Sequence, residues 1–358
     1  MSNRELTRSD RMNDLQRAFR RFAEVEAKGL ASPTYEELAR GVSNDDDLLH
    51  IALSTKTHQP APNMLFAAVQ YLLLTGVQHS LSAYYPIISG QTPRNQSAFT
   101  DFRDFCLHHR DAIVELIHTR RTQTNVVRRC TCLLPVFSLV SEESDLPLAL
   151  VDIGASAGLN LNFDRYYYTY QLNQKKEVNW GSADSKIHLE AEVEESGSFP
   201  TLSPAIEVAS RDGIDLDPVD LGNSDQLLWL RALIWPEHIE RHQQLIDAAV
   251  EFTHSDIHLH AGDATDVLPR LISTFSYEHA LVVYSTITLY QFPIENRKRL
   301  THALEEASKN RPVWQIALEG IEPAVSITRY RDGTSDTEIL ADASPHGWWM
   351  KWREHEPQ

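Results

Sequence analysis

The chain has 358 residues, of which 42% are hydrophobic, so it is long enough for two domains or one elaborated domain. The chain has 33 Lys and Arg residues and 50 Asp and Glu residues. The resulting net charge of −17 argues against a nucleic-acid partner or binding to an anionic membrane surface. The sequence has three cysteines, and its N-terminus has no apolar signal core. Its apolar runs are well short of the roughly 20 residues of a membrane span. These features predict a cytoplasmic protein with buried thiols.

Residues 1–140 are expected to form a helical region that caps the rest of the chain. Apolar residues recur at helical spacing in "NDLQRAFRRFAEVEA", and "SPTYEELARGV" begins with Ser-Pro followed by two glutamates, which is typical of a helix start. Two further helices are expected in "PNMLFAAVQYLLL" and "AFTDFRDFCLHHRDAIVELIHTRR". Persuasive strand-like alternation begins only at residue 147.

Residues 141–358 show a different pattern, in which short apolar strands alternate with helices. This alternation predicts an α/β domain with a doubly wound, mostly parallel sheet. A strand-rich insertion is expected at about residues 165–210. The turn signal at Asp332-Gly333 predicts an antiparallel hairpin that ends the sheet. The expected strands lie in "LALVDI", "SDIHLHAGD", "HALVVYSTI" and "PVWQIALEG".

The segment "LALVDIGASAGLNL" joins the first expected strand to a loop with two glycines, Gly154 and Gly158. A dinucleotide fingerprint would require three glycines in the frame G-x-G-x-x-G, and two of them are missing. The frame acid-x-G-x-G-x-G, the first motif of S-adenosylmethionine-dependent methyltransferases, fits better, with Asp152 as the acid and Ser156 at the middle glycine. That resemblance implies that loop N–H groups bind the cofactor carboxylate and that Asp152 binds its ammonium group. A tight strand-to-helix turn without a ligand is the alternative.

Two later acids follow expected strands and extend the resemblance. Asp215, with Asp217 in reserve, matches the acid that accepts both ribose hydroxyls. Asp263 would accept from the adenine amino group, and the backbone of Ala264 and Thr265 would line the ring. Each acid could instead be a helix cap or a turn residue. Their common position at the carboxyl ends of parallel strands favours cofactor binding.

The chain is also similar to the bacterial domain-of-unknown-function family 2332 over nearly its whole length. This resemblance implies a Rossmann-like methyltransferase fold behind a helical N-terminal region, and it implies no substrate. Relatives are expected to have an acid after the Gln-Thr-Asn triplet, where this chain has Val126. The matching stretches are "SPTYEELARGV", "PNMLFAAVQYLLL", "RRTQTNVVRR", "DIGASAGLNLNFDRYYY", "RDGIDLDPVD", "LRALIWPE", "GDATDVLP" and "SPHGWWMKW".

Candidate residues for chemistry lie in three places. The fourth strand of the domain brings a tyrosine and two hydroxyl residues to the sheet edge, a polar stretch precedes "CLLPVFSLV", and one histidine lies in "SPHGWW". Each has a structural alternative: ordinary loop polarity, a domain contact, or a hydrogen-bonded histidine. The tyrosines from 166 to 170 could form a lid or the core of the insertion, and no metal site is expected. The candidates are Tyr284 and His346 for catalysis, and Gln123, Asn125, Arg129, Ser285 and Thr286 for the substrate pocket.

The sequence therefore supports two main hypotheses. The first is an S-adenosylmethionine-dependent methyltransferase that acts on a small molecule, with the helical region and the insertion covering the site. The second is a non-catalytic cofactor-binding or regulatory protein on the same fold. A nicotinamide oxidoreductase is disfavoured by the frame of the glycine loop.

Overall fold

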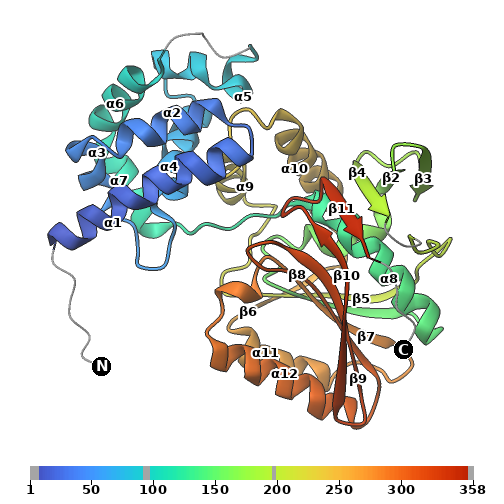
Figure 1. Cartoon of the computed structure of the whole chain (residues 1–358). Helices are drawn as coiled ribbons and strands as arrows, with labels where there is room; N and C mark the ends of the chain where they lie inside the picture. Colours follow the sequence, from blue (N-terminus) through green and yellow to red (C-terminus); the bar gives the residue numbers. More distant parts are fainter. Residues whose placement is uncertain (1–7, 92–96, 196–198, 354–358) are drawn as a thin grey trace. The chain divides into compact units, whose positions relative to one another are not determined.

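A computed structural model describes residues 8–91, 97–195 and 199–353 (Figure 1). The chain divides into two compact units, Met1–Thr124 with Asn223–Gln243, and Asn125–Gly222 with Gln244–Gln358. This division differs from the expected boundary at residue 140. Residues 125–140 belong to the second unit because they pack on its sheet, and residues 223–243 return to the first unit because they pack on its helices.

The first unit is helical in its described residues. Gln70, which interrupts the apolar helix α4 (Ala61–Leu74), is fully buried. Its amide group donates to the carbonyls of Ala232 and Ile234, at and just beyond the end of α9 (Ser224–Ala232), where helix carbonyls lack intrahelical partners. The other helices of this unit are α1 (Arg8–Arg21), α2 (Pro33–Val42), α3 (Asp46–Ala52), α5 (Pro86–Ser89), α6 (Phe99–His108) and α7 (Arg110–Thr119); α10 (Ile239–Phe252) begins here and ends in the second unit.

Two features of these helices differ from the sequence-based expectation. Residues 22–27 form a π-helical turn, which rotates the following side chains, so that Val25 is 60% exposed while Phe22 is buried. The segment "PEHIERHQQLIDAAVEF" also suits a helix that starts at Pro236, yet α10 begins three residues later, at Ile239.

The second unit contains an eleven-stranded sheet of order β3-β2-β4-β11-β10-β9-β8-β7-β1-β5-β6. Six of its ten neighbouring pairs are parallel. The strands are β1 (Leu148–Ile153), β2 (Tyr167–Leu172), β3 (Lys176–Trp180), β4 (His188–Glu195), β5 (Val208–Asp215), β6 (His258–Ala261), β7 (Ala280–Thr286), β8 (Val313–Glu319), β9 (Ala324–Arg331), β10 (Thr334–Ala343) and β11 (Trp349–Trp352).

Five parallel strands in the order β6-β5-β1-β7-β8 position the candidate site. From β1 the chain adds β5 and β6 on one side, then returns to add β7 and β8 on the other. The direction of addition reverses between β1 and β7. In open parallel sheets, ligands bind outside the carboxyl ends of the strands at such a switch point.

Helices cover both faces of these parallel strands. α8 (Cys130–Ser144) packs on one face, where Phe137 contacts the ring of Tyr284 edge-on. α11 (Ala264–Ile272) and α12 (Ile294–Ser308) pack side by side on the other face, against Val151 and Ile153 (Figure 1). Successive strand residues face opposite sides, so Asp152 lies on the α8 side.

The expected C-terminal hairpin, β9 and β10, lies inside the sheet and not at its edge. β9 and β10 pair antiparallel, and φ is positive at both residues of the Asp332-Gly333 turn, as in the tight turns that Asp-Gly pairs favour. The expectation that this hairpin ends the sheet is wrong, because β11 pairs with β10 and then, in parallel, with β4 of the insertion. The insertion thus extends the sheet.

Three of the four tyrosines from 166 to 170 are core residues, while Tyr167 is half-buried. Tyr166, Tyr168 and Tyr170 are fully buried, and their hydroxyls donate to the carbonyls of Leu159, Phe163 and Thr131. They therefore do not form a lid. All three cysteines are likewise buried and free, as expected. None of the helices in the described residues combines the length and hydropathy needed to cross a membrane.

Candidate functional site

Polar side chains gather where the parallel strands end. Asp152 is the penultimate residue of β1, and Tyr284 and Ser285 lie opposite Asp152 and Ile153 on β7. Asp215 ends β5, and Glu319 ends β8. Because parallel strands align their carboxyl ends, these residues meet at the switch point between β1 and β7.

Asp152 is a buried carboxyl group without a full set of partners. It is 2% exposed, and its Oδ1 has no hydrogen-bond partner among the described residues. Burial raises its pKa to about 8; the Tyr284 hydroxyl and Arg129 oppose this rise, while the carboxylates of Asp215 and Glu319 add to it. A buried carboxyl with a raised pKa and an incompletely bonded oxygen is a candidate for a ligand-binding role.

Three buried hydroxyl groups lie on β7 and in the loop after β1. Within the described part of the chain, Ser156 Oγ, Tyr284 Oη and Ser285 Oγ are buried and have no hydrogen-bond partner of ordinary geometry. Tyr284 is fully buried under α8, so its side chain does not open to the edge of the sheet. The Tyr284 hydroxyl faces Asp152 and lowers its pKa, whereas Ser285, the next residue of β7, faces the α11 side of the sheet.

The loop after β1 uses every backbone N–H group from residue 154 to residue 159 within the protein. Gly154 and Ala155 donate to Ile214 O at 2.8 and 3.2 Å, and Gly158 donates to Ala155 O at 2.8 Å. Ser156 donates to Asp215 Oδ2 at 2.9 Å. Ala157 and Leu159 both donate to Asn125 Oδ1, at 3.2 and 3.1 Å. The expectation that these N–H groups bind a cofactor carboxylate therefore needs correction, because each already has an acceptor.

The loops after β1 and β7 both contain residues in the left-handed region of the backbone. Gly154 and Gly158 have φ of 82° and 74°, and Ser156, at the middle position of the motif, has φ of 54°. Ile287, directly after β7, has φ of 55°, which is strained for a β-branched residue. Such outliers concentrate at functional sites, and here they occupy the two loops on either side of the switch point.

Asn125 and Gln123, both expected in a substrate pocket, are in different units. Gln123 belongs to the first unit and Asn125 to the second. Asn125 accepts the two N–H groups of the glycine loop and donates to Asn160 Oδ1 at 3.4 Å. Its carboxamide therefore holds the loop and is not directed at a substrate.

Arg129 is buried and is bonded to backbone carbonyl groups. Its Nε donates to Pro345 O at 2.9 Å and its Nη1 to Thr286 O at 3.1 Å. Burial lowers the pKa of its guanidinium to about 10, which Glu319 and Asp152 partly offset. Arg129 thus joins the end of β7 to the turn that contains His346 and supplies positive charge near Asp152.

Glu319, the last residue of β8, binds the loop after β7. Its carboxylate accepts the N–H groups of Thr288, Leu289 and Tyr290, at 2.9 to 3.2 Å. These bonds fix the strained loop after β7. The local sequence gives no signal for this contact, because about thirty residues separate the carboxylate from the loop.

The remaining expected cofactor residues have clear structural roles. The carboxylate of Asp215 accepts the N–H groups of Ser156 and Asp217, so it joins the loops after β1 and β5. Asp263 is the N-cap of α11 and accepts the N–H and hydroxyl of Thr265 at 2.8 and 2.7 Å. Ala264 is buried in the core that α11 forms with the sheet.

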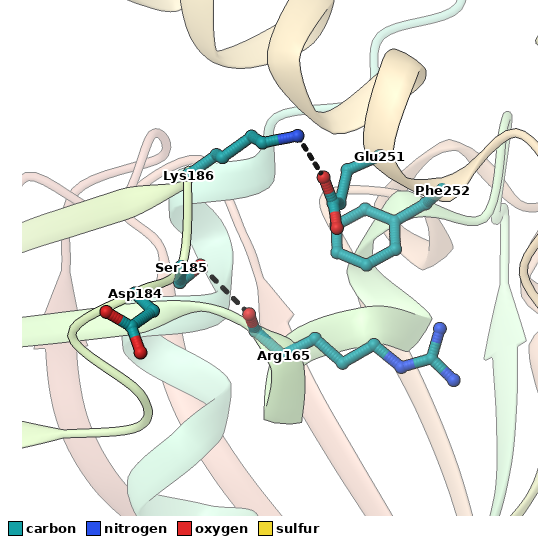
Figure 2. Close-up of a pocket in the computed structure, with 6 residues that line it drawn as sticks. All are labelled: Arg165, Asp184, Ser185, Lys186, Glu251 and Phe252. Carbon is teal, nitrogen blue, oxygen red and sulfur yellow. Dashed lines mark hydrogen bonds and ion pairs between the residues drawn. The ribbon is translucent and has the colours of Figure 1, made fainter.

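Two cavities of the second unit lie away from Asp152. One, of about 240 Å³, is a surface hollow lined by six residues, in which Lys186 reaches Glu251 at 2.8 Å (Figure 2). The other, of about 510 Å³, is a groove between α11 and α12, and Thr265 is one of the residues that line it. In the described residues, no three His, Cys, Asp or Glu side chains come together as metal ligands would.

The model of a family described as "Uncharacterized protein conserved in bacteria (DUF2332)" matches residues 16–352 of the chain. The chain belongs to this family. A search of curated proteins finds no match.

In this member of the family, residues 128–131 pack against residues 345–348 of the second unit. The guanidinium of Arg128 lies 3.7 Å from the centre of the Trp348 ring, and Thr131 Oγ1 donates to Gly347 O at 2.8 Å. A side chain at Gly347 would collide with the Arg128 carbonyl, which explains the glycine. These contacts, with the Arg129 bond to Pro345, hold His346 at the same sheet edge as Asp152.

Proposed function

We propose that this protein is an S-adenosylmethionine-dependent methyltransferase that acts on a small molecule. The observation that supports this most is the buried Asp152, which lies at the switch point of a doubly wound sheet with one oxygen unsatisfied. A cationic group is the partner that this carboxyl lacks. The order β6-β5-β1-β7-β8 agrees with a Rossmann-like methyltransferase sheet, which we include in the proposal.

The glycine loop argues against ligands that present a phosphate to it. Pyrophosphate sites use free backbone N–H groups at the start of a helix. In this loop all six N–H groups from residue 154 to residue 159 have acceptors, and a carboxyl group lies at its start. A ligand with an ammonium group and no phosphate suits this site better than a nicotinamide dinucleotide.

The residues present can satisfy each polar part of the proposed cofactor. Asp152 would accept from its ammonium group, and the hydroxyl of Ser156, in the loop after β1, would donate to its carboxylate. Asp215, at the end of β5, would accept from the ribose hydroxyls. Among the described residues, Oδ2 of Asp263 accepts one contact, from Asn296 at 3.4 Å, and it would accept from the adenine amino group.

When bound, this cofactor supplies an electrophilic methyl group, and the protein's contribution to such a displacement is mainly placement. Glu319 bonds to the loop after β7, and Arg129 bonds to Thr286 at the end of β7, so that the loop has a fixed position beside the site. A non-catalytic binding protein would use the same residues. Release of S-adenosylhomocysteine in the presence of candidate acceptors would distinguish the methyltransferase from this alternative.

Calorimetry of the full chain with S-adenosylhomocysteine and, separately, with NAD⁺ tests the cofactor. We expect S-adenosylhomocysteine to bind and to raise the melting temperature, and NAD⁺ to do neither. Binding of NAD⁺ alone would overturn the proposal.

A pair of variants tests the position of the ribose. Asp215→Ala removes charge-assisted acceptors worth about 1.5–3 kcal/mol each, so we expect at least a tenfold loss of affinity for S-adenosylhomocysteine. Asp217→Ala is the matched control, because Asp217 contributes its backbone N–H to Asp215 and keeps it in the variant. A loss of affinity in Asp217→Ala alone would place the ribose on the other acid.

A further inference from the structure

The surroundings of Asp152 favour the neutral acid as long as no cationic ligand is present. The carboxyl is fully enclosed, and the guanidinium of Arg129 near it already donates to two backbone carbonyls. The carboxylates of Asp215 and Glu319 further disfavour a negative charge on Asp152. Five groups interact with the ionisation of Asp152 through charge or a hydrogen bond: Tyr284 from β7, Asp215 from β5, Glu319 from β8, Arg129 from the 3₁₀ turn before α8, and Cys130 from α8.

We propose that Asp152 holds a proton in the unliganded protein and releases it when a cationic ligand group binds beside it, so that ligand binding is coupled to proton release. This inference rests on the proposed function only for the identity of the ligand. The Asp152 carboxyl O–H breaks, the proton passes to solvent, and the carboxylate then pairs with the ammonium group of the ligand. The site would thereby recognise ligands by their positive charge and would bind them more tightly as pH rises.

Two features of the site make this exchange favourable. An unpaired carboxylate buried here would have a large desolvation penalty, which protonation removes. A bound ammonium group compensates the same penalty through a charge-assisted hydrogen bond to the unsatisfied Oδ1. A neutral Asp152 is also compatible with the two other acids nearby, whereas three ionised carboxylates around one arginine would repel each other.

Infrared spectroscopy of the unliganded protein tests the first half of the proposal without any ligand. At pH 7 we expect the carbonyl band of a protonated carboxylic acid in the wild type and its loss in Asp152→Asn. Asp256→Asn, which changes a carboxyl group that is 92% exposed, is the matched control and should keep the band. Absence of the band from the wild type at pH 7, or its persistence in Asp152→Asn, would overturn the proposal.

A second variant serves if Asp152→Asn does not fold. The Tyr284 hydroxyl favours the ionised form of Asp152, so Tyr284→Phe should shift the midpoint of the infrared titration to higher pH. A midpoint that stays unchanged or moves to lower pH would contradict the proposed surroundings of Asp152.

Calorimetry with S-adenosylhomocysteine tests the second half. Binding at pH 7, measured in two buffers of different ionisation enthalpy, should release about 0.9 proton, given the pKa of about 8 for Asp152. Affinity should rise about ninefold from pH 6 to 7 and about fivefold from pH 7 to 8. Binding without proton release and with a flat pH profile would overturn this inference and leave the proposed function intact. Absence of binding at every pH would overturn the proposed function, while the infrared result would still decide the state of Asp152.

Discussion

The side chain of Thr288 occupies the space that a Cβ atom on Gly154 would need. The two residues belong to the loops after β1 and β7. Their contact therefore joins these loops at the switch point, where the side on which the chain adds strands to the sheet reverses. Gly154 also has φ of 82°, which residues with a side chain rarely adopt.

We therefore expect Gly154→Ala to destabilise the protein by about 1–3 kcal/mol, from backbone strain together with the collision. Urea unfolding measures this change. Gly29→Ala is the control, because a Cβ at Gly29 meets nothing within 4 Å and its backbone is not left-handed. Equal stability of the two variants would show that the loop adjusts freely.

Asn125→Ala should release the glycine loop. The change leaves the N–H groups of Ala157 and Leu159 without their acceptor, and each such buried donor costs about 1–3 kcal/mol. Asn125→Asp keeps an acceptor oxygen for both and should lose less stability. Hydrogen exchange at residues 157 and 159 reports the effect directly, and continued protection of these amides in Asn125→Ala would contradict the assigned role.

Ile287→Asn should stabilise the isolated protein by about 1 kcal/mol, because asparagine tolerates the left-handed backbone that isoleucine disfavours. Ile287→Val keeps the β-branch and should give no such gain. Thermal unfolding of both variants measures the difference. If the strain serves ligand binding, the more stable variant should bind S-adenosylhomocysteine more weakly.

Acid stability should depend on His242, which is fully buried in the first unit. Burial lowers its pKa to about 3, from about 6.5 in an unfolded chain. Between these values the unfolded state binds a proton that the folded state does not. Stability therefore falls as pH decreases below about 6.5, by up to roughly 1.4 kcal/mol per pH unit from this residue.

Between pH 6 and pH 4, His242→Gln should reduce the pH dependence of the unfolding free energy by the amount that corresponds to about one bound proton. Urea unfolding at several pH values measures this change. Glutamine stays neutral and can still donate to the Trp235 carbonyl, the present partner of His242. His118→Gln, at an exposed histidine of the same unit, should leave the slope unchanged. An unchanged slope in His242→Gln would mean that His242 is protonated in the folded state.

The sequence by itself determined the features that depend on local patterns. Hydrophobic runs with turn residues at their ends predicted β1, β7 and β8 close to their observed bounds, because each strand needs one buried segment of suitable length. The same pattern located Asp152 and Asp215 at strand ends, and parallel pairing brings such ends together.

The tertiary structure decided which groups are already bonded. Asn125 was a candidate for a substrate pocket or for a domain contact, and its carboxamide holds residues that lie more than thirty positions away. Glu319 and Arg129 likewise bond to backbone groups of the loop after β7. The positions of β11 and β4 in the sheet also depended on pairing between distant segments. A local pattern cannot specify such partners, because hydrogen-bond donors and acceptors are assigned only when segments distant in the sequence pack together.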